Sequence, residues 1–251
     1  MKWMHKVNPA WLEERKSYLS ASDIKKLLPV TPTGRKRSQD AINEAYLKAW
    51  AEKQCGITED DVTSFGPMAR GHIMEPYAIN EFNRLKVLIP LVHWDDMLIH
   101  RNGVACSPDA LDVEMPTTGT SITDVPARLL GEVKSYNASM HYVTGLADKM
   151  ELEERWQLAT AFYVIETLEV AALILFNPNA KHKMFTHIYT RDDLKDEIKS
   201  VEEISEEYRL WSNAYATECE LNCVASADCI DEAAIIEELE EAMAIEHGLN
   251  P

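Results

Sequence analysis

The chain has 251 residues, of which 46% are hydrophobic and 27% charged, a composition typical of a globular protein with a sizeable core. It contains no run of about 18 apolar residues, which excludes a transmembrane helix, and its first residues lack the apolar core of a signal peptide. Five cysteines without an export signal predict a reducing, cytoplasmic location.

The net charge of −17 is unevenly distributed along the chain. Residues 202–251 hold 14 acidic side chains against one basic, whereas residues 1–37 hold nine Lys or Arg against three acids. A basic front end is suited to face phosphates, while an acidic region stays in solvent or keeps DNA in one path. We therefore expect one domain over 1–201 and an acidic helical extension over 202–251; a merely solvated acidic tail is the alternative.

The first third of the chain has the hydrophobic spacing of helices. Four are expected, at residues 8–19, 20–28, 40–54 and about 67–85. Ser20 or Ser22 can cap the second helix, and Pro76 predicts a kink or a restart in the fourth. A basic loop, "PVTPTGRKRSQD", separates the second helix from the third.

The spacing then changes to that of strands. Strands or bent hairpin arms are expected at residues 87–100, 103–114, 129–136, 169–178 and 183–190, and helices at about 139–166 and from 192 onward. Trp156, Phe162 and Tyr163 have helical spacing and are expected in the core rather than as a base-stacking platform. This order predicts an α/β or α+β fold, with a mixed central sheet flanked by helices.

The stretch "LLGEVKSY" places Glu132 and Lys134 on one face of a strand, because alternate residues share a face. Asp109 follows Pro108 at a bend in the preceding strand. If the two strands are neighbours, the Asp109 and Glu132 carboxylates converge and require a cation between them. Mg²⁺ suits such oxygen ligands, and the residue types do not distinguish it from Mn²⁺. Beside that metal, Lys134 can orient or deprotonate water, which predicts metal-assisted phosphodiester hydrolysis.

These motifs also carry a family resemblance. "SPDAL" followed by "GEVK" resembles the PD-(D/E)xK nuclease superfamily, and "MEPYA" resembles its upstream acidic motif. Together with "WLEERKSYLSASDIKKLL" before them and "WQLATAFYVI…LFNP" after them, they are similar in order to the phage lambda exonuclease and YqaJ-like viral recombinase group. The resemblance covers about residues 11–178 and implies a restriction-endonuclease-like core.

The resemblance implies a role for each matching residue. Metal ligands would be Asp109, Glu132 and the Val133 carbonyl, with Glu75 as an additional acidic group near the metal. Lys134 would be the catalytic lysine, and Gln157 would help to order the site. A 5′-phosphate would bind to Arg15, Ser22 and either Arg35 or Arg37, which is reasonable for a capped helix start beside a guanidinium.

The resemblance also implies a function. It is that of a Mg²⁺-dependent exonuclease that degrades linear double-stranded DNA from 5′ to 3′ and leaves 3′ single strands for phage-type recombination. The group implies a ring-shaped homotrimer, a single-strand annealing partner and no membrane partner. It further implies a phage or prophage gene expressed in the cytoplasm of a bacterial host.

Several simpler interpretations stay open. Asp109 after Pro108 can be a turn residue, Glu75 an exposed helix residue, and Gln157 a packing residue. Arg15 can form a surface ion pair with Glu13 or Glu14. The sequence also departs from the family at Ala110, where glycine is frequent, and in the long connection between Asp109 and Glu132.

The sequence also allows functions other than that of an exonuclease. Cys55, Cys219, Cys223 and Cys229 allow an iron–sulfur nuclease of the Cas4 and AddB type, although the C-x₃-C-x₅-C spacing and acidic surroundings disfavour a cluster. A non-catalytic DNA-binding protein with a degenerate nuclease fold and a site-specific endonuclease are further alternatives. The eight histidines show no spacing typical of a zinc site.

Overall fold

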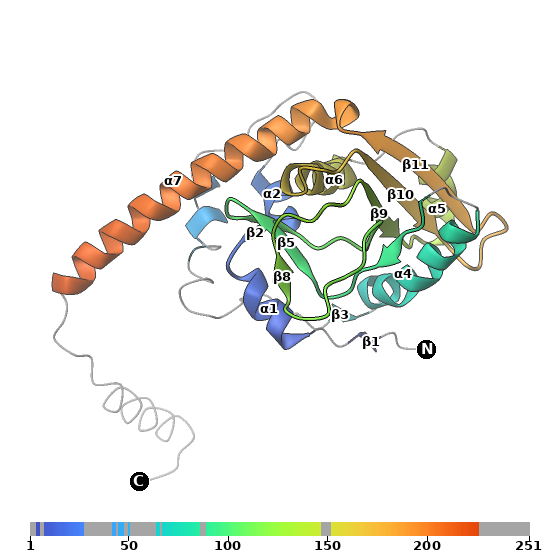
Figure 1. Ribbon diagram of the computed structural model, residues 1–251, viewed down its shortest axis with the longest axis horizontal. Coiled ribbons are helices and arrows are strands. Elements are labelled where there is room, and N and C mark those ends of the chain that lie inside the picture. The colour runs from blue at the N-terminus through green and yellow to red at the C-terminus, as the bar shows by residue number, and fades with distance from the viewer. Residues whose placement is uncertain are drawn as a thin grey trace, which may run out of the picture. The chain divides into compact units, whose positions relative to one another are not determined.

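The computed structural model describes residues 4–5, 8–27, 42–43, 45–47, 50, 64–65, 67–85, 89–146 and 152–225 (Figure 1). The chain divides into two compact units, residues 1–210 and 211–251. The predicted boundary between 201 and 202 stays a prediction, since residues 226–251 lie outside the described part. None of the described helices has the length and apolar character that crossing a bilayer requires.

The N-terminal region forms short elements with clear local causes. They are β1 (Met4–His5), which pairs antiparallel with β3 (Ser64–Phe65), then α1 (Pro9–Arg15), β2 (Leu19–Ser20) and α2 (Ala21–Leu27). The Asn8 side chain caps α1 by accepting the N–H of Ala10 at 3.0 Å. Ser20 caps α2, because its hydroxyl accepts the N–H of Asp23 while the Asp23 carboxylate accepts the N–H of Ser20.

The next two predicted helices are helical wherever the structure describes them. Residues 42–43, 45–47 and 50 of the predicted helix 40–54 are helical, and Tyr46 is fully buried. Helix α4 (Pro67–Arg84) runs through Pro76 as one element, so the predicted restart does not occur. The basic loop at 29–40 lies outside the described residues.

A five-stranded mixed sheet forms the centre of the fold. Its order is β11 (Met184–Thr190), β10 (Val170–Phe176), β9 (Leu129–Lys134), β7 (Ala110–Leu111) and β4 (Val92–His93). Strands β9 and β10 are parallel, and the other neighbours are antiparallel. The predicted mixed sheet is therefore present.

A second sheet has the order β2, β6 (Val104–Cys106), β5 (Leu98–Arg101) and β8 (Ser121–Ile122). The prediction of single arms at 87–100 and 103–114 was wrong, because each arm divides between the two sheets. Asp96 has a positive φ of 51° between β4 and β5, and Pro108, which has no N–H for a sheet ladder, lies between β6 and β7.

The single helix predicted at 139–166 is also corrected. Two helices, α5 (Ala138–Leu146) and α6 (Leu152–Val164), occupy this range and contact different elements. Helix α5 packs against β10 and β11, whereas α6 packs against α2, β5 and β6. The helical region predicted from residue 192 is confirmed through the described part, as a short 3₁₀ turn (Asp192–Leu194) and α7 (Lys195–Ala225).

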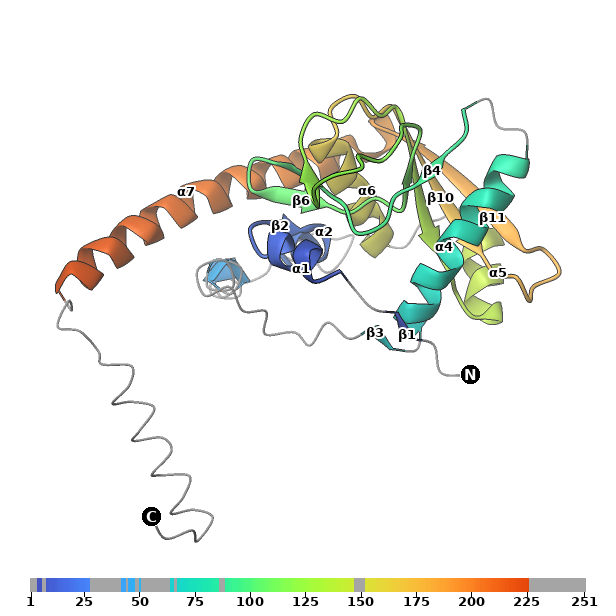
Figure 2. The ribbon, with the colours of Figure 1, turned by 60° about the horizontal axis from the view of Figure 1, so that its bottom comes forward.

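The core lies on both faces of the central sheet. Figures 1 and 2 show α4 and α6 on opposite sides of β9 and β10. Ala78, Ile79 and Phe82 of α4 pack against Val133 and Ile174. Gly131 allows this close packing, since a Cβ there would lie 2.6 Å from Leu91 Cδ1. Trp156, Phe162 and Tyr163 on α6 are buried, as predicted.

Candidate functional site

The pairing of β7 with β9 brings the two predicted metal-binding carboxylates together. Ala110 is opposite Gly131 and Leu111 is opposite Leu130, so the next pair along this register is Asp109 and Glu132. The Asp109 carboxylate accepts the N–H of Val133 at 2.7 Å. The strands inferred to be neighbours are therefore neighbours, despite the long connection between them.

The long connection is closed by side-chain hydrogen bonds to its backbone. The Asp112 carboxylate accepts the N–H groups of Arg128 and Leu129, at 2.9 and 3.1 Å, immediately before β9 begins. Near its start, the Trp94 indole donates to the Val113 carbonyl. These bonds hold the two ends of the connection beside β7 and β9, while residues 121–122 within it form β8 of the second sheet.

Glu132 and Lys134 lie on the face of β9 opposite α4, because Val133 between them packs into the α4 core. The Lys134 ammonium donates to Glu132 at 2.8 Å. Burial opposes its charge, but Glu132, Asp109 and Glu154 outweigh this effect and raise the pKa of Lys134. Lys134 is therefore held as a cation beside two carboxylates.

Asp109 is buried among other acids of the candidate site. Burial, followed by the charges of Glu132 and Glu75, raises the pKa of Asp109 well above its usual value. Lys134 and the Val133 N–H oppose this effect only in part. Carboxylates crowded in this way gain stability from an added cation.

Glu75 is buried, which argues against the exposed-helix interpretation. Its two oxygens lie 3.2 Å from His72 Nδ1 and 3.6 Å from His93 Nε2. Burial opposes the Glu75 carboxylate, but the two histidines outweigh it and lower its pKa to about 2. His72 and His93 were missed as site residues; only the three-residue helical spacing of His72 and Glu75 was a usable signal.

The oxygen donors fit the chemistry of Mg²⁺, which takes one or two carboxylates and fills its remaining positions with water. Asp109 and Glu132 supply such oxygens at one place. In the described part of the chain, no three His, Cys, Asp or Glu side chains already converge into a complete metal cage.

Helix α6 carries Gln157, which was expected to order the site, and a buried glutamate that was not expected. Gln157 lies half-buried in α6. Glu154, three residues earlier, is buried and accepts a hydrogen bond from the Tyr136 hydroxyl. Sequence patterns gave no signal for Glu154, because the contact joins residues from separate elements.

The predicted phosphate-binding residues are only partly described. Ser20 is opposite Ala105 in the β2–β6 ladder, so the start of α2 lies beside the strand that leads to Asp109. Arg15 donates to Ser20 Oγ at 3.4 Å and stacks over Trp11. Ser22 is half-buried in α2, and Arg35 and Arg37 lie outside the described residues.

The neighbouring glutamates have partners other than Arg15. Glu13 pairs with Lys16 at 2.6 Å, and Glu14 accepts the hydroxyls of Tyr18 and Ser121. Among these described side chains, Arg15 therefore forms no ion pair with Glu13 or Glu14.

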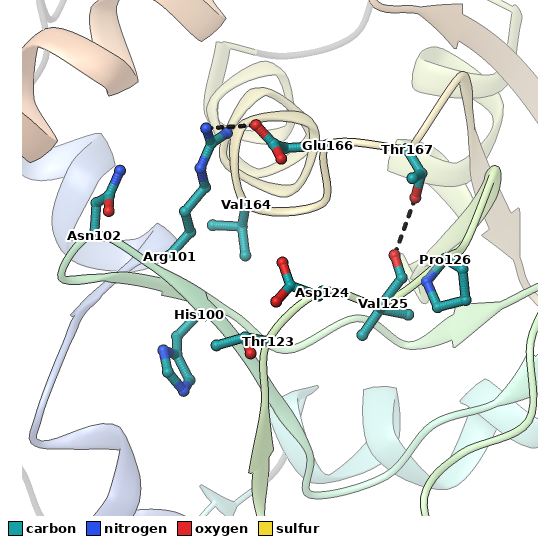
Figure 3. Close-up of a pocket in the computed structure, with 10 residues that line it drawn as sticks. All are labelled: His100, Arg101, Asn102, Thr123, Asp124, Val125, Pro126, Val164, Glu166 and Thr167. Carbon is teal, nitrogen blue, oxygen red and sulfur yellow. Dashed lines mark hydrogen bonds and ion pairs between the residues drawn. The ribbon is translucent and has the colours of Figure 1, made fainter.

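A separate cavity of about 480 Å³ is lined by the end of β5, by the segment after β8 and by the end of α6 with the residues that follow it (Figure 3). An Arg101–Glu166 ion pair closes one side, and Thr167 donates to the Val125 carbonyl. None of the predicted site residues lines this cavity. The site is therefore defined by its carboxylates and Lys134, not by this cavity.

The four cysteines named for an iron–sulfur cluster are only partly described. Cys55 and Cys229 lie outside them, and Cys219 and Cys223 are placed only as parts of α7. Cys106 is a buried free thiol in β6, and burial raises its pKa.

Comparison with solved structures identifies the fold. LHK-Exo in complex with dAMP aligns with a TM-score of 0.64 at 17% identity, over 88% of this chain and 100% of that one. The alkaline exonuclease LHK-Exo from Laribacter hongkongensis gives 0.56 at 16% identity, over 84% and 99%. A phage-related exonuclease from Haemophilus somnus 129PT gives 0.50 at 14%, over 80% and 96%. No protein-family model and no curated protein sequence matches. The chain thus has the fold of alkaline and phage-related exonucleases, as its motifs predicted.

Proposed function

We propose that the protein is a Mg²⁺-dependent exonuclease that degrades linear double-stranded DNA from 5′ to 3′ and leaves 3′ single strands for recombination. The observation that carries the proposal is the joint position of Asp109, Glu132 and Lys134 at the β7–β9 pair. The shared fold with exonucleases supports the same reaction class. The dAMP in the LHK-Exo complex belongs to the product class that this reaction releases.

Residues of this chain would supply both the ligands of the metal ion and the negative charge that attracts it. Asp109, Glu132 and the Val133 carbonyl would hold Mg²⁺, with Glu75 close enough to influence the Asp109 charge. When bound, Mg²⁺ supplies charge stabilisation for the phosphate in the transition state. Mn²⁺ has the same ligand preferences and is expected to replace it.

Lys134 is the residue expected to act on the reacting atoms. Its ammonium is held 2.8 Å from Glu132, where it can hydrogen-bond a water molecule or a phosphate oxygen. A water oxygen attacks phosphorus, the bond from phosphorus to O3′ breaks, and O3′ takes up a proton. The terminal nucleotide leaves with a free 3′-hydroxyl, and the next nucleotide retains the 5′-phosphate. Gln157 would help to order this site from α6.

Recognition of the DNA end is proposed for the N-terminal basic region. Arg15 and Ser22, together with Arg35 or Arg37, would bind the terminal 5′-phosphate. The pairing of β2 with β6 supports this proposal, because it places the α2 start beside the strand that leads to Asp109. By the family resemblance, the partners would be a single-strand annealing protein and further copies of the chain in a ring-shaped trimer.

The direct test is digestion of linear and circular duplex DNA with Mg²⁺ or EDTA. Linear substrates would carry a 5′-phosphate or a 5′-hydroxyl, and a fluorescent label on either the 5′-ended or the 3′-ended strand. We expect mononucleotides from 5′-phosphorylated linear DNA only with metal, and intact circles. Discrete fragments from circles would indicate a site-specific endonuclease, and binding without cleavage would indicate a non-catalytic DNA-binding protein.

A further inference from the structure

Two histidines contact the buried Glu75 carboxylate from different elements. His72, three residues earlier in α4, has its Nδ1 3.2 Å from Glu75 Oε1, and His93 in β4 has its Nε2 3.6 Å from Glu75 Oε2. Each oxygen of the carboxylate therefore faces one imidazole. A carboxylate held at both oxygens keeps one orientation, whereas a carboxylate held at one oxygen can still rotate about its terminal bond.

The Nε2 atom of His93 has no other explanation among the described contacts. It is buried and has no hydrogen-bond partner among the described atoms, although buried polar atoms normally have one. Its distance from Glu75 is that of an ion pair rather than of a hydrogen bond, and such contacts in active sites often tighten only when substrate binds. Glu75 is therefore the group that this nitrogen serves.

Strand β4 connects this histidine with the candidate metal site. His93 is opposite Ala110 in the β4–β7 ladder, and the N–H of Trp94 donates to the Asp109 carbonyl at 2.9 Å. The two residues of β4 that fix the backbone of Asp109 and Ala110 thus include the histidine that contacts Glu75. This pairing places the Glu75 carboxylate one side chain away from the strand end that carries Asp109.

The Glu75 carboxylate keeps part of its hydrogen-bonding capacity. Two carboxylate oxygens offer about four acceptor sites, and the two imidazoles occupy one on each oxygen. Mg²⁺ in proteins usually keeps several waters. A carboxylate that is already fixed near Asp109 can bind such a cation or accept from its waters without first losing rotational freedom.

We propose that His72 and His93 are positioning residues for Glu75: the two imidazoles hold its carboxylate in one orientation near Asp109 and thereby strengthen metal binding. This inference rests on the proposed nuclease function and extends it to two histidines to which the family resemblance assigns no role. Groups that orient a metal-binding carboxylate typically change metal affinity or activity by about 10- to 100-fold.

The first readout is metal binding by the full-length protein without DNA. Mn²⁺ is the probe, because electron paramagnetic resonance measures the free ion directly, and the site that Asp109→Asn removes defines the binding to be compared. We expect the dissociation constant to rise about 10- to 100-fold in His72→Ala and in His93→Ala. His72→Asn and His93→Gln keep a donor near the position of Nδ1 and Nε2, respectively, so they should lie between the alanine variants and wild type.

A double-mutant cycle with Glu75→Gln separates positioning from other roles. If His93 acts through Glu75, His93→Ala in the Glu75→Gln background should change the Mn²⁺ dissociation constant and kcat by less than about twofold. A structural role, or direct binding of the metal by the histidine, predicts that the full effect persists in that background.

His187→Gln is the matched control. This half-buried histidine of β11 contacts the Thr144 carbonyl at 3.2 Å and belongs to the α5–β11 contact. Its substitution should leave Mn²⁺ affinity and kcat within about twofold of wild type. All variants are compared at one pH, and circular dichroism checks their folding. If an alanine variant does not fold, His72→Asn and His93→Gln carry the comparison.

Failure of this inference and failure of the proposed function give different results. Unchanged Mn²⁺ affinity in the histidine variants, or a full effect of His93→Ala in the Glu75→Gln background, overturns the positioning role even if wild type cuts DNA. If wild type binds Mn²⁺ at Asp109 but cuts no DNA, the nuclease function is wrong, and the Mn²⁺ affinities alone decide the positioning role. A wild type that binds no Mn²⁺ overturns both.

Discussion

The backbone N–H of Val133 donates a 2.7 Å hydrogen bond to the carboxylate of Asp109. This bond fixes an acidic side chain from one strand against the backbone of the strand that carries Glu132 and Lys134. It does so although burial and two neighbouring carboxylates raise the pKa of Asp109. The site therefore holds its acids in a crowded arrangement that a divalent cation would stabilise.

Asp109→Asn should separate the structural role of this residue from its chemical role. Asparagine can still accept the Val133 N–H, so the thermal unfolding midpoint should change little. Nuclease activity should fall at least about a hundredfold, because one charged metal ligand is lost. Rates measured over a range of Mg²⁺ concentrations check this. Near-normal activity at ordinary Mg²⁺ would exclude Asp109 as a ligand.

Glu75→Gln should reduce stability over a defined pH range. Burial opposes the carboxylate, but His72 and His93 lower its pKa from 4.5 to about 2, so its stabilising contribution is complete above about pH 4.5 and lost toward pH 2. The Glu75 hydrogen bond, opposed by burial, raises the pKa of His72 from 6.5. That contribution is complete below about pH 6.5 and is lost as the pH rises through the raised value.

The difference between wild type and Glu75→Gln should therefore be largest between about pH 4.5 and 6.5, at roughly 2–3 kcal/mol. Urea unfolding in EDTA from pH 3 to 8 measures it. Glu81→Gln removes an exposed pair with Arg84 and should change stability by less than about 1 kcal/mol. A Glu75→Gln effect independent of pH would contradict the assigned ion pairs.

Two glycine substitutions should change stability in opposite directions. A Cβ at Gly145 would lie 2.2 Å from the Phe185 ring, so Gly145→Ala should destabilise the α5–β11 contact by about 1–3 kcal/mol. A Cβ at Gly71 in α4 would meet nothing within 4 Å, and Gly71→Ala should stabilise the helix by up to about 1 kcal/mol. Denaturant unfolding of both variants is the measurement. If both variants changed the free energy of unfolding in the same direction, the packing described around one of the two glycines would be wrong.

Arg15→Ala should weaken the preference for 5′-phosphorylated ends. The guanidinium lies at the start of α2 beside Ser20, and loss of a charged hydrogen bond to phosphate should cost about tenfold or more in that preference. The measurement of this preference is the ratio of the digestion rates on 5′-phosphorylated and 5′-hydroxyl duplexes. Arg84→Ala, which removes the same charge from an exposed ion pair, is the control and should leave the ratio unchanged.

The sequence predicted the juxtaposition of Asp109, Glu132 and Lys134 better than it predicted the strands. Glu132 and Lys134 share a face because they are two residues apart in one strand, and bringing Asp109 beside them required only the assumption that the two strands are neighbours. The division of residues 87–100 and 103–114 between two sheets was not predicted, because the choice of partner strand depends on tertiary contacts. The positive φ at Asp96 is one local cause that carried no clear sequence signal.

Two residues near the site, His93 and Glu154, were missed for the same reason. His93 approaches Glu75 from β4, and Glu154 approaches Tyr136 from α6, so each contact joins segments at least 18 residues apart. No local spacing encodes such contacts. His72 was missed for a different reason, since its three-residue spacing from Glu75 is common on exposed helices.

The central claim is that Lys134 acts at a metal-dependent nuclease site. Its most direct test is the release of nucleotides from 5′-phosphorylated linear duplex by wild type and Lys134→Ala, with Mg²⁺ or EDTA, alongside DNA binding by both proteins. We predict release by wild type only with Mg²⁺, and a loss of about 10²- to 10³-fold in the variant with binding retained. Equal release by both proteins, or release by wild type in EDTA, would contradict the claim.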